Sequence, residues 1–279
     1  MKITGQHVLI TGASKGLGRL IALRFATRGA KVTIAARNQD ALASVLEEMA
    51  PLGKGPFVSI PTDVSERAQV EHLFHEAESQ IGPIDILINN AALERIEFFW
   101  EADYEALDQD LRVNVRAPMY LSQLCLKGML ERDRGHIVNI GSLAGLGGYT
   151  HGESYVASKH AIVGFTRALR ASLKSLNGNV SASCVCPGFV SGVGMFARKQ
   201  TSNGANAPRI LGSTAPENVV DATLKVIERD LPEVIVNTSP VRPFLAIFAL
   251  FPRFGEWLAR KTGVHAVAKQ VTDHQSETE

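Results

Sequence analysis

The sequence predicts an α/β fold, a parallel sheet covered by helices on both faces. Short segments that are almost wholly apolar alternate along the chain with longer segments whose apolar residues recur at helical spacing. The first strand, His7–Thr11, is joined to a helix, Arg19–Arg28, by a glycine-rich turn, and a second strand follows at Val32–Ala36. Such a strand–helix–strand unit of about 30 residues is typical of doubly wound sheets, which bind ligands at the carboxyl ends of their strands.

Length and composition indicate one large domain with a full core. The chain has 279 residues, of which 45% are hydrophobic and 20% charged. Its net charge of +1 gives no indication of nucleic-acid binding. The three cysteines, two of them in the apolar run Cys184–Cys186, fit a reducing compartment and no metal site. No signal peptide precedes the first strand, and no apolar run approaches the roughly 20 residues that span a bilayer, so we expect a cytoplasmic protein.

The glycine-rich turn after the first strand predicts a dinucleotide site. Its spacing is Gly-x-x-x-Gly-x-Gly, which is neither the Gly-x-Gly-x-x-Gly fingerprint nor a P-loop. Glycines let the backbone turn tightly and approach a pyrophosphate, which then rests on the amides and the positive end of the helix dipole. The expected contacts are Gly12, Ser14, Lys15, Gly16, Leu17 and Gly18.

The end of the second strand favours NADP(H) over NAD(H). An acidic residue at this position usually binds the ribose hydroxyl of NAD, but the segment Ala35–Asn38 holds no carboxylate. Arg37 is available to bind a 2′-phosphate through two parallel N–H bonds, with Asn38 beside it, and Lys15 adds a second cation. The alternative is that Arg37 and Lys15 are ordinary solvated surface charges.

Two further strands end in polar residues that would reach the same edge of the sheet. Asp63, after the strand Phe57–Pro61, would hydrogen-bond the adenine ring or cap the helix Glu66–Ile81. Asn89, in the strand Ile84–Asn90, would brace the sheet and border the cofactor. The expected cofactor contacts at these two strand ends are Asp63, Val64, Asn89 and Ala91.

Ser142, Tyr155 and Lys159 form a candidate apparatus for moving a proton. Tyr155 and Lys159 stand four residues apart at the start of an expected helix, Tyr155–Leu176, so they share one face. A fixed cation beside the phenol favours the ionised form of a tyrosine, whose ordinary pKa is roughly 10. Ser142, after the expected strand His136–Ile140, would hydrogen-bond a substrate oxygen. On its own, a Tyr-x-x-x-Lys spacing also arises by chance in many helices.

Taken together, these motifs resemble the short-chain dehydrogenase/reductase family. The resemblance implies a Rossmann-type sheet of seven parallel strands, a nicotinamide cofactor, and a homodimer or homotetramer built on the two long middle helices. The matching residues, in order and spacing over roughly residues 5–235, are Thr11-Gly12-x-x-x-Gly16-x-Gly18, Asn89-Asn90-Ala91, Asn114, Ser142, Tyr155-x-x-x-Lys159 and Pro187-Gly188.

The resemblance also implies roles for individual residues. Tyr155 would be the catalytic acid/base, and Lys159 would lower its pKa and hold the nicotinamide ribose. Ser142 would polarise the substrate oxygen. Asn114 would support a water-linked proton relay, whereas its place in an expected helix over Tyr104–Met129 indicates by itself only packing.

Two positions depart from the family pattern. Ala92 stands where the family often has the glycine of Asn-Asn-Ala-Gly, and we expect little effect because a small residue is kept. Gly192 stands where the family often has a threonine that holds the nicotinamide carboxamide, and we expect Ser191 to substitute for it. The expected cofactor contacts in this segment are Pro187, Gly188 and Val190.

Residues 189–212 have low periodicity and contain several glycines, so we expect a mobile lid over the substrate. Charged residues are scarce around the expected pocket, which favours a neutral, hydrophobic ketone or secondary alcohol. Glu94, Arg95, His151 and Glu153 are expected at its rim. The lid would present Phe189, Val193, Met195 and Phe196 to an opposite wall of Leu143, Leu146 and Tyr149. The substrate contacts that we expect are Leu143, Tyr149, Phe189 and Met195.

We expect one catalytic domain over residues 1–239, an extension over 240–271 and a flexible tail over 272–279. The extension holds an apolar run, Val241–Phe251, and a short amphipathic run, Phe254–Lys261. Four cations and one anion lie between residues 240 and 261. Aromatic residues beside cations suit a segment that lies on a membrane, but they also suit a surface that covers a partner subunit or the substrate pocket.

The predicted function is NADP(H)-dependent transfer of hydride between nicotinamide and a hydrophobic ketone or secondary alcohol. Tyr155 would exchange the proton, and Ser142 would hydrogen-bond the substrate oxygen. One alternative is a peripheral membrane reductase of lipid-like ketones or steroids, which the C-terminal extension motivates. Another is a non-catalytic protein that senses NADP(H), against which the Ser–Tyr–Lys set argues.

Overall fold

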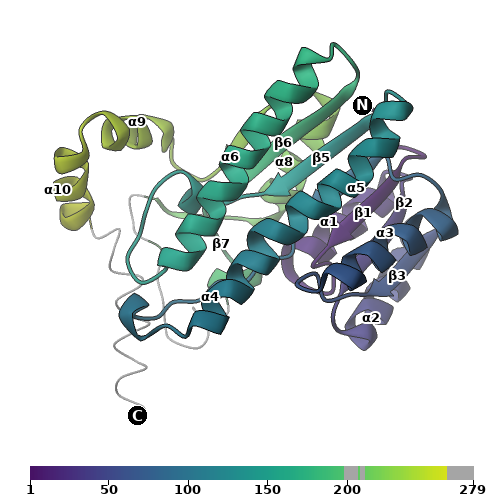
Figure 1. Cartoon of the computed structure of the whole chain (residues 1–279), viewed down its shortest axis with the longest axis horizontal. Coiled ribbons are helices and arrows are strands. Elements are labelled where there is room, and N and C mark those ends of the chain that lie inside the picture. The colour runs from purple at the N-terminus through teal and green to yellow at the C-terminus, as the bar shows by residue number, and fades with distance from the viewer. Residues whose placement is uncertain (198–206, 208–210, 263–279) are drawn as a thin grey trace.

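The computed structural model describes residues 1–197, 207 and 211–262, and Figure 1 shows their arrangement. Seven parallel strands form one sheet in the order β3-β2-β1-β4-β5-β6-β9. The order reverses between β1 and β4, the switch point at which doubly wound sheets bind ligands. The predicted Rossmann-type sheet is confirmed. Its strands are β1 (His7–Thr11), β2 (Lys31–Ala36), β3 (Phe57–Pro61), β4 (Ile86–Asn89), β5 (Gly135–Ile140), β6 (Val180–Pro187) and β9 (Glu233–Val236).

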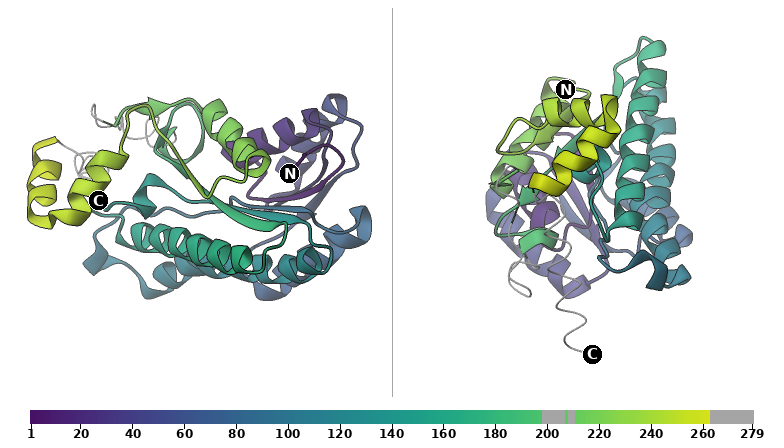
Figure 2. Two further views of the ribbon diagram at one scale, coloured as in Figure 1. Left: turned by 90° about the horizontal axis from the view of Figure 1, so that it is seen from above. Right: turned by 90° about the vertical axis from the view of Figure 1, so that its left-hand side faces the viewer.

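Helices cover both faces of the sheet, as Figure 2 shows. In β1, Val8 and Ile10 belong to the core on one face, and Leu9 between them belongs to the core on the other. Successive side chains of a strand point to opposite faces, so a strand that is apolar throughout is buried on both. One face carries α1 (Gly16–Thr27), α2 (Gln39–Met49) and α8 (Pro216–Glu228), and the other carries α3 (Arg67–Ile81), α5 (Ala117–Glu131) and α6 (Glu153–Ser175).

The segment leading into α5 differs from the single helix that was predicted over Tyr104–Met129. Helix α4 (Tyr104–Leu111) is followed by a π-helical turn, Arg112–Arg116, and only then by α5. A π turn inserts an extra residue into the helical repeat, and such turns are frequent at functional sites. Asn114 lies within this turn and is buried. Apolar spacing therefore predicted the helix correctly but not this local widening.

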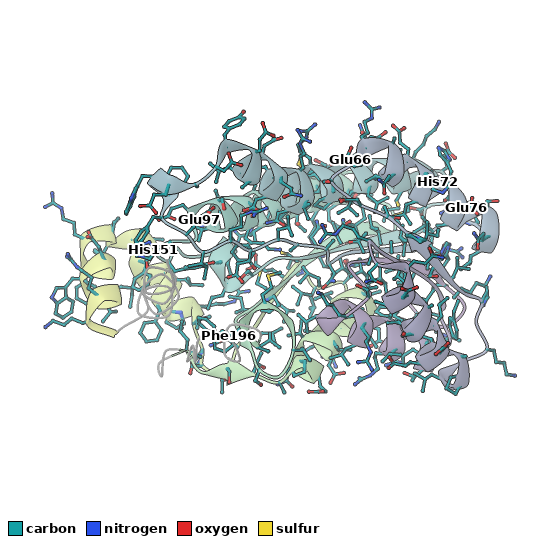
Figure 3. The ribbon with its side chains drawn as sticks, turned by 90° about the horizontal axis from the view of Figure 1, so that it is seen from below. Glu66, His72, Glu76, Glu97, His151 and Phe196 are labelled. Carbon is teal, nitrogen blue, oxygen red and sulfur yellow. The ribbon has the colours of Figure 1, made fainter. Side chains whose placement is uncertain are left out.

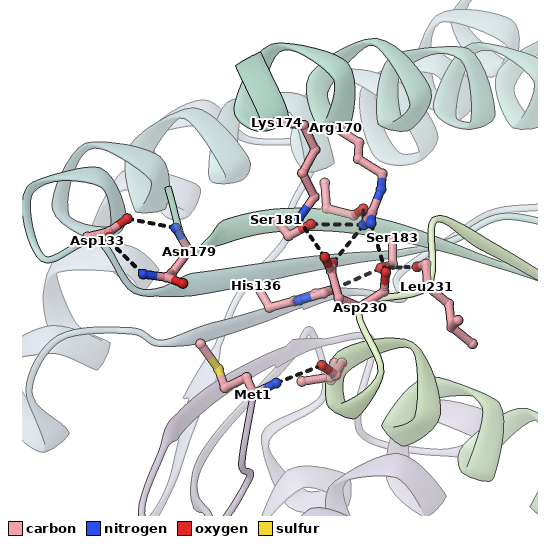
Figure 4. Close-up of polar contacts among 12 residues, drawn as sticks. Met1, Asp133, His136, Arg170, Lys174, Asn179, Ser181, Ser183, Asp230 and Leu231 are labelled. Carbon is pink, nitrogen blue, oxygen red and sulfur yellow. Dashed lines mark hydrogen bonds and ion pairs between the residues drawn. The ribbon is translucent and has the colours of Figure 1, made fainter. Parts of the chain in front are cut away.

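A polar network holds α6 at the end of the sheet away from the strands' carboxyl ends (Figure 4). Arg170 of α6 donates to Asp230 Oδ1 at 2.8 Å, to Asp230 O at 2.7 Å and to Ser181 Oγ at 2.8 Å. Lys174, one turn later, lies 2.5 Å from the other carboxylate oxygen of Asp230. His136 pairs with Ser183 Oγ at 2.8 Å across β5 and β6. The network fixes the helix whose opposite end carries Tyr155.

A second, two-stranded sheet brings together the beginning and the end of the long segment that follows β6. β7 (Phe189–Val190) pairs in parallel with β8 (Ser213–Thr214). The predicted lid, 189–212, runs between these strands. Residues 198–206 and 208–210 of it lie outside the described residues, so a mobile lid stays a prediction.

After β9 the chain forms two helices, α9 (Arg242–Leu250) and α10 (Pro252–Thr262), that pack on each other as a hairpin. The hairpin projects at one end of the molecule (Figures 1 and 2). Gly255 permits the close packing, because a Cβ there would lie 2.6 Å from Phe248 Cδ1. The rest of the extension and the predicted tail, 263–279, lie outside the described residues. Among the helices described, none combines the length and the apolar character needed to cross a bilayer.

Candidate active site

The glycine turn is fixed by hydrogen bonds between the ends of β1 and β4. Asn90 Nδ2 donates to the carbonyls of Thr11 and Gly12 at 3.0 and 3.1 Å. Thr11 Oγ1 in turn accepts from the backbone amides of Asn90 and Ala91 at 3.1 and 3.2 Å. Gly12 has a φ of +66°, and a Cβ on it would lie 2.8 Å from Ala91 Cα. Only glycine fits this turn without moving the neighbouring strand end.

The start of α1 offers backbone amides to an anion. The helix begins at Gly16, and Lys15 before it provides no side-chain cap. The first N–H groups of a helix have no partner within the helix, and the dipole makes this end positive. No acidic residue stands in the first turn to occupy the site. The residues present therefore fit the pyrophosphate of a dinucleotide.

Ser142, Tyr155 and Lys159 meet at the carboxyl end of β5. Ser142 follows that strand, and Tyr155 and Lys159 come from the first turns of α6. Lys159 Nζ donates to the carbonyl of Ile140 at 2.9 Å and lies 5.6 Å from the centroid of the Tyr155 ring. Both side chains are buried, at 8% exposure for Tyr155 and 3% for Lys159. The sheet thus places a phenol, a hydroxyl and an ammonium in one site.

Burial changes the protonation of both groups. It raises the pKa of Tyr155 above its ordinary value, the charge of Glu94 acts in the same direction, and a hydrogen bond with Ser142 acts against them. Burial also lowers the pKa of Lys159 to about 8, and the nearby Cys184, Cys186 and Glu94 oppose this change. Burial is the largest of these influences on Tyr155, and the expectation that Lys159 lowers its pKa stays a prediction. A neutral phenol is the form that can donate a proton.

Asn114 joins the site through the π-helical turn. Its Oδ1 accepts from the amide of Leu93 at 2.8 Å, and its Nδ2 donates to Leu93 O at 2.8 Å and to Ser158 Oγ at 3.0 Å. Ser158 Oγ donates in turn to the carbonyl of Tyr155 at 2.7 Å. Asn114 therefore ties the loop after β4 to the helix that carries Tyr155. Its part in a proton relay stays a prediction.

One cavity of about 250 Å³ unites the parts of the site. Leu17 of the glycine turn, Ser142, Tyr155 and Lys159 all line it. The other lining side chains are mainly apolar, and a concave apolar pocket with a few convergent polar groups is typical of a small-molecule site. Further lining residues include Leu143, Tyr149, Pro187, Gly188, Phe189, Val190, Val193, Met195 and Phe196. All four predicted substrate contacts lie in this wall, whereas Leu146 packs against Val163 and the buried cysteines instead.

The C-terminal hairpin forms one wall of the cavity. Phe244, Leu245 and Phe248 of α9 and Leu258 of α10 line it, together with Val241. The sequence left open whether the extension lies on a membrane, contacts a partner subunit or covers the pocket. The structure places one face of it on the pocket. Helical spacing of the aromatic residues indicated an apolar face but not what that face would contact.

Glu94 is a half-buried polar residue among the mainly apolar side chains of the pocket. It lines the cavity, and its Oε1 accepts from Tyr149 Oη at 3.0 Å. Arg95, in contrast, points away and pairs with buried Asp110 at 3.0 Å. Burial and Glu94 together raise the pKa of Tyr149, so this phenol stays neutral. Sequence gave no signal that separated Glu94 from its neighbour.

The loop after β4 is held against the loop before α6 at the pocket end of the molecule. The amide of Glu97 donates to the carbonyl of His151 at 3.0 Å, and the rings of Phe98 and His151 pack edge to face at 5.0 Å. Figure 3 shows Glu97 and His151 near each other, with Phe196 on the other side of the same end. Phe196 contacts Phe189 with ring centroids 4.8 Å apart. These contacts border the pocket from two sides.

The residues predicted to select the cofactor lie at the same edge of the sheet. Arg37 and Lys15 are exposed, and neither forms an ion pair with the described residues. Asn38 caps α2 by accepting from the amide of Ala41 at 2.8 Å. Asp63 accepts from the amide and hydroxyl of Ser65 at 2.9 and 2.7 Å and does not cap α3. Val64 packs beside the second core.

Asn89 braces the sheet as predicted, and its place at the border of the cofactor stays a prediction. Its Nδ2 donates to Asn139 Oδ1 at 2.8 Å and lies within reach of Pro118 O and Ser122 Oγ, so the buried side chain braces β4, β5 and α5. Asn90, its neighbour, lines the cavity; the sequence placed it in the family motif but not among the expected cofactor contacts. Adjacent residues at a strand end point to opposite faces, so the two amides have different surroundings.

The segment of Ser191 and Gly192 follows β7 and is tied to β8. Ser191 Oγ donates to the carbonyl of Thr214 at 3.2 Å, and its amide donates to the same oxygen at 3.0 Å. The hydroxyl thus helps to join β7 to β8, and its role in place of the family threonine stays a prediction. Gly192 has a φ of +73°, a conformation that few other residues adopt readily.

Comparison with known proteins decides the family. A family model described as short chain dehydrogenase matches residues 6–204. The chain belongs to the short-chain dehydrogenase/reductase family. Ketoacyl reductase HetN of Nostoc sp. is 38% identical over 239 residues, which cover 86% of this chain and 81% of the relative.

Two solved structures in the family share the fold. An actinorhodin polyketide ketoreductase variant with NADPH has a TM-score of 0.76 at 28% identity, covering 83% of this chain and 95% of that one. A short-chain dehydrogenase/reductase from Burkholderia phymatum in complex with NAD has a TM-score of 0.74 at 29% identity, covering 90% and 92%. The protein is an oxidoreductase that acts on C=O or CH–OH groups with a nicotinamide cofactor.

Proposed function

We propose that the protein is an NADP(H)-dependent reductase of hydrophobic ketones, or in the other direction a dehydrogenase of secondary alcohols. The observation that carries the proposal is the buried Tyr155 with Ser142 in a mainly apolar cavity that also reaches the glycine turn. The ketoacyl reductase and the polyketide ketoreductase to which the chain is similar act, by their names, on keto groups.

The residues of the site divide the reaction between them. When bound, the cofactor supplies or accepts the hydride. Tyr155 gives its proton to the oxygen that becomes an alcohol, and Ser142 donates a hydrogen bond to that same oxygen. Lys159 is close enough to stabilise the tyrosinate that remains. The apolar wall excludes water, which strengthens each of these interactions.

The choice of NADP(H) rests on Arg37 and Lys15 at the edge of the sheet. Both are exposed cations that form no ion pair with the described residues, and the segment Ala35–Asn38 at the end of β2 holds no acidic side chain. We expect Arg37→Ala to raise the KM for NADPH about tenfold or more while that for NADH changes little, because a charge-assisted contact with the 2′-phosphate is lost. Lys225→Ala, which removes an exposed cation from α8, serves as the control. Equal efficiency of the wild type with NADH would refute the preference.

A panel of ketones graded by chain length, assayed with NADPH, tests the substrate class. Turnover that rises with the apolar length of the ketone supports the proposal. Binding of NADPH without turnover across the panel would instead favour the sensor alternative.

We also propose that the protein forms a homodimer or homotetramer through its middle helices. Leu111, Met119 and Leu130 are each more than two-fifths exposed on or beside α4 and α5, which supports an interface there. Sedimentation velocity over a range of concentrations tests this, and a monomer at all of them would contradict it.

A further inference from the structure

The α9–α10 hairpin has a second apolar face, which points away from the pocket. We call it the outer face and define it by Leu250, Phe251, Phe254 and Trp257. Their exposures are 72%, 61%, 50% and 48%. The rings of Phe254 and Trp257 stack with centroids 5.5 Å apart. The four large apolar side chains lie within eight consecutive residues, from the end of α9 through the turn into α10. The ribbon of this hairpin projects at one end of the molecule (Figure 2).

Cations accompany the outer face. Arg253, Arg260 and Lys261 are exposed on α10. Arg260 lies 3.7 Å from Glu256 one turn earlier, in a pair that is two-thirds exposed at both ends and so contributes little. Arg253 and Lys261 form no ion pair with the described residues, so their charges are available to a partner. The partner that fits this surface has an apolar interior and an anionic rim.

We propose that the outer face docks on the surface of a lipid bilayer that contains anionic headgroups. Helices that lie in the membrane interface bury aromatic and aliphatic side chains at the acyl boundary and keep arginine and lysine among the headgroups. Each basic residue near an anionic leaflet adds to the attraction, and the attraction is screened by salt. The hairpin has both features, and α10 is amphipathic.

A second copy of this chain is the alternative occupant, and charge argues against two outer faces packed on each other, because the cations of both copies would repel. The other exposed aromatic residues of the described chain nearby are Phe99, Trp100 and Tyr104, which stand among acidic residues. Such a patch would attract the basic outer face, but its rings are spread over a 3₁₀ turn and the start of α4. A planar anionic surface matches a convex projecting hairpin better.

Docking would give the hairpin a role in substrate access, a step that rests on the proposed function. Phe244, Leu245, Phe248 and Leu258 line the pocket from the inner side of the same two helices. A hydrophobic ketone partitions into lipid, so a pocket wall seated on the bilayer would receive substrate directly from it. The membrane contact itself requires no turnover and can be measured without any substrate.

Vesicle binding by the full-length chain tests the proposal. The chain has two tryptophans, so Trp100→Phe leaves Trp257 as the sole reporter. We expect a blue shift of its fluorescence and co-sedimentation with phosphatidylcholine vesicles that contain phosphatidylglycerol. We expect binding at least about tenfold weaker to pure phosphatidylcholine vesicles, because the headgroup charge is absent.

Two variants and one control separate the contribution of the aromatic side chains from that of the cations. Phe254→Ser with Trp257→Ser should abolish sedimentation, and Arg253→Glu with Lys261→Glu should lower binding at least about tenfold. The matched control, Phe99→Ser with Trp100→Ser, removes exposed aromatic residues elsewhere and should bind as the wild type does. Thermal unfolding verifies that each variant folds.

Absence of binding, binding indifferent to headgroup charge, or equal loss in the control would overturn the proposal. The proposal would also be overturned if the wild type formed oligomers in the absence of lipid and the Phe254→Ser, Trp257→Ser variant did not. The outer face would then bind a second copy of the chain. A protein that binds vesicles but reduces no ketone would leave the docking intact and refute the proposed function alone.

Discussion

Replacing Lys159 by methionine is expected to stabilise the protein at neutral pH while it removes turnover. Lys159 is buried, and burial lowers its pKa from 10.5 to about 8. That difference corresponds to a cost of about 3 kcal/mol for keeping the charged form in the folded protein at pH 7. The variant loses the hydrogen bond from Nζ to Ile140 O and leaves that carbonyl unpaired, at about 1 to 2 kcal/mol. The net gain is therefore about 1 to 2 kcal/mol.

The pH dependence distinguishes this account from better packing by methionine. Below pH 8 the lysine is charged in both the folded and the unfolded state, so the full cost is present. Above pH 10.5 it is neutral in both, and the cost is gone. Urea unfolding of the wild type and Lys159→Met at pH 7 and near pH 10 should show the variant's advantage shrinking as the pH rises. A variant that is less stable by the same amount at both values would refute the reasoning.

Two other titrating groups give further predictions. Glu94→Gln removes a charge that raises the pKa of Tyr155, so the basic limb of the pH profile of kcat/KM should move to lower pH, and an unmoved limb would exclude this coupling. Burial lowers the pKa of His136 from 6.5 to about 4, so on acidification the unfolded chain binds a proton at His136 before the folded protein does. The wild type should therefore lose up to about 3 kcal/mol of stability as the pH falls from 6.5 to 4. His136→Gln should lack that part of the loss in pH-dependent urea unfolding, and an unchanged slope would show that other groups cause it.

The sheet could be predicted from sequence because its strands are apolar on both faces. A run such as Val8-Leu9-Ile10 is compatible with few environments, and the alternation with helices left a covered parallel sheet as the simplest arrangement. Because parallel strands end at the same edge of the sheet, the residues that follow their carboxyl ends were expected to lie close together. Ser142, Tyr155 and Lys159 could be brought together by this argument before any coordinates.

What sequence could not give depends on long-range packing. The apolar face of the hairpin was visible in the spacing of Phe244 and Phe248, but the cavity on which it packs is formed by segments about 100 residues earlier. The pKa of Tyr155 depends on how deeply the phenol is buried, which the four-residue spacing to Lys159 does not reveal. The roles of Asn89 and Asn90 depended on where one strand ends.

The central claim is that Tyr155 supplies the proton to the substrate oxygen. Single-turnover oxidation of NADPH by Tyr155→Phe, with a ketone that the wild type reduces, tests it most directly. Loss of this acid should slow the step about 10²- to 10⁴-fold while the Kd for NADPH, measured by fluorescence, stays within a few-fold of the wild type. A variant that reduces the ketone at close to the wild-type rate would contradict the account.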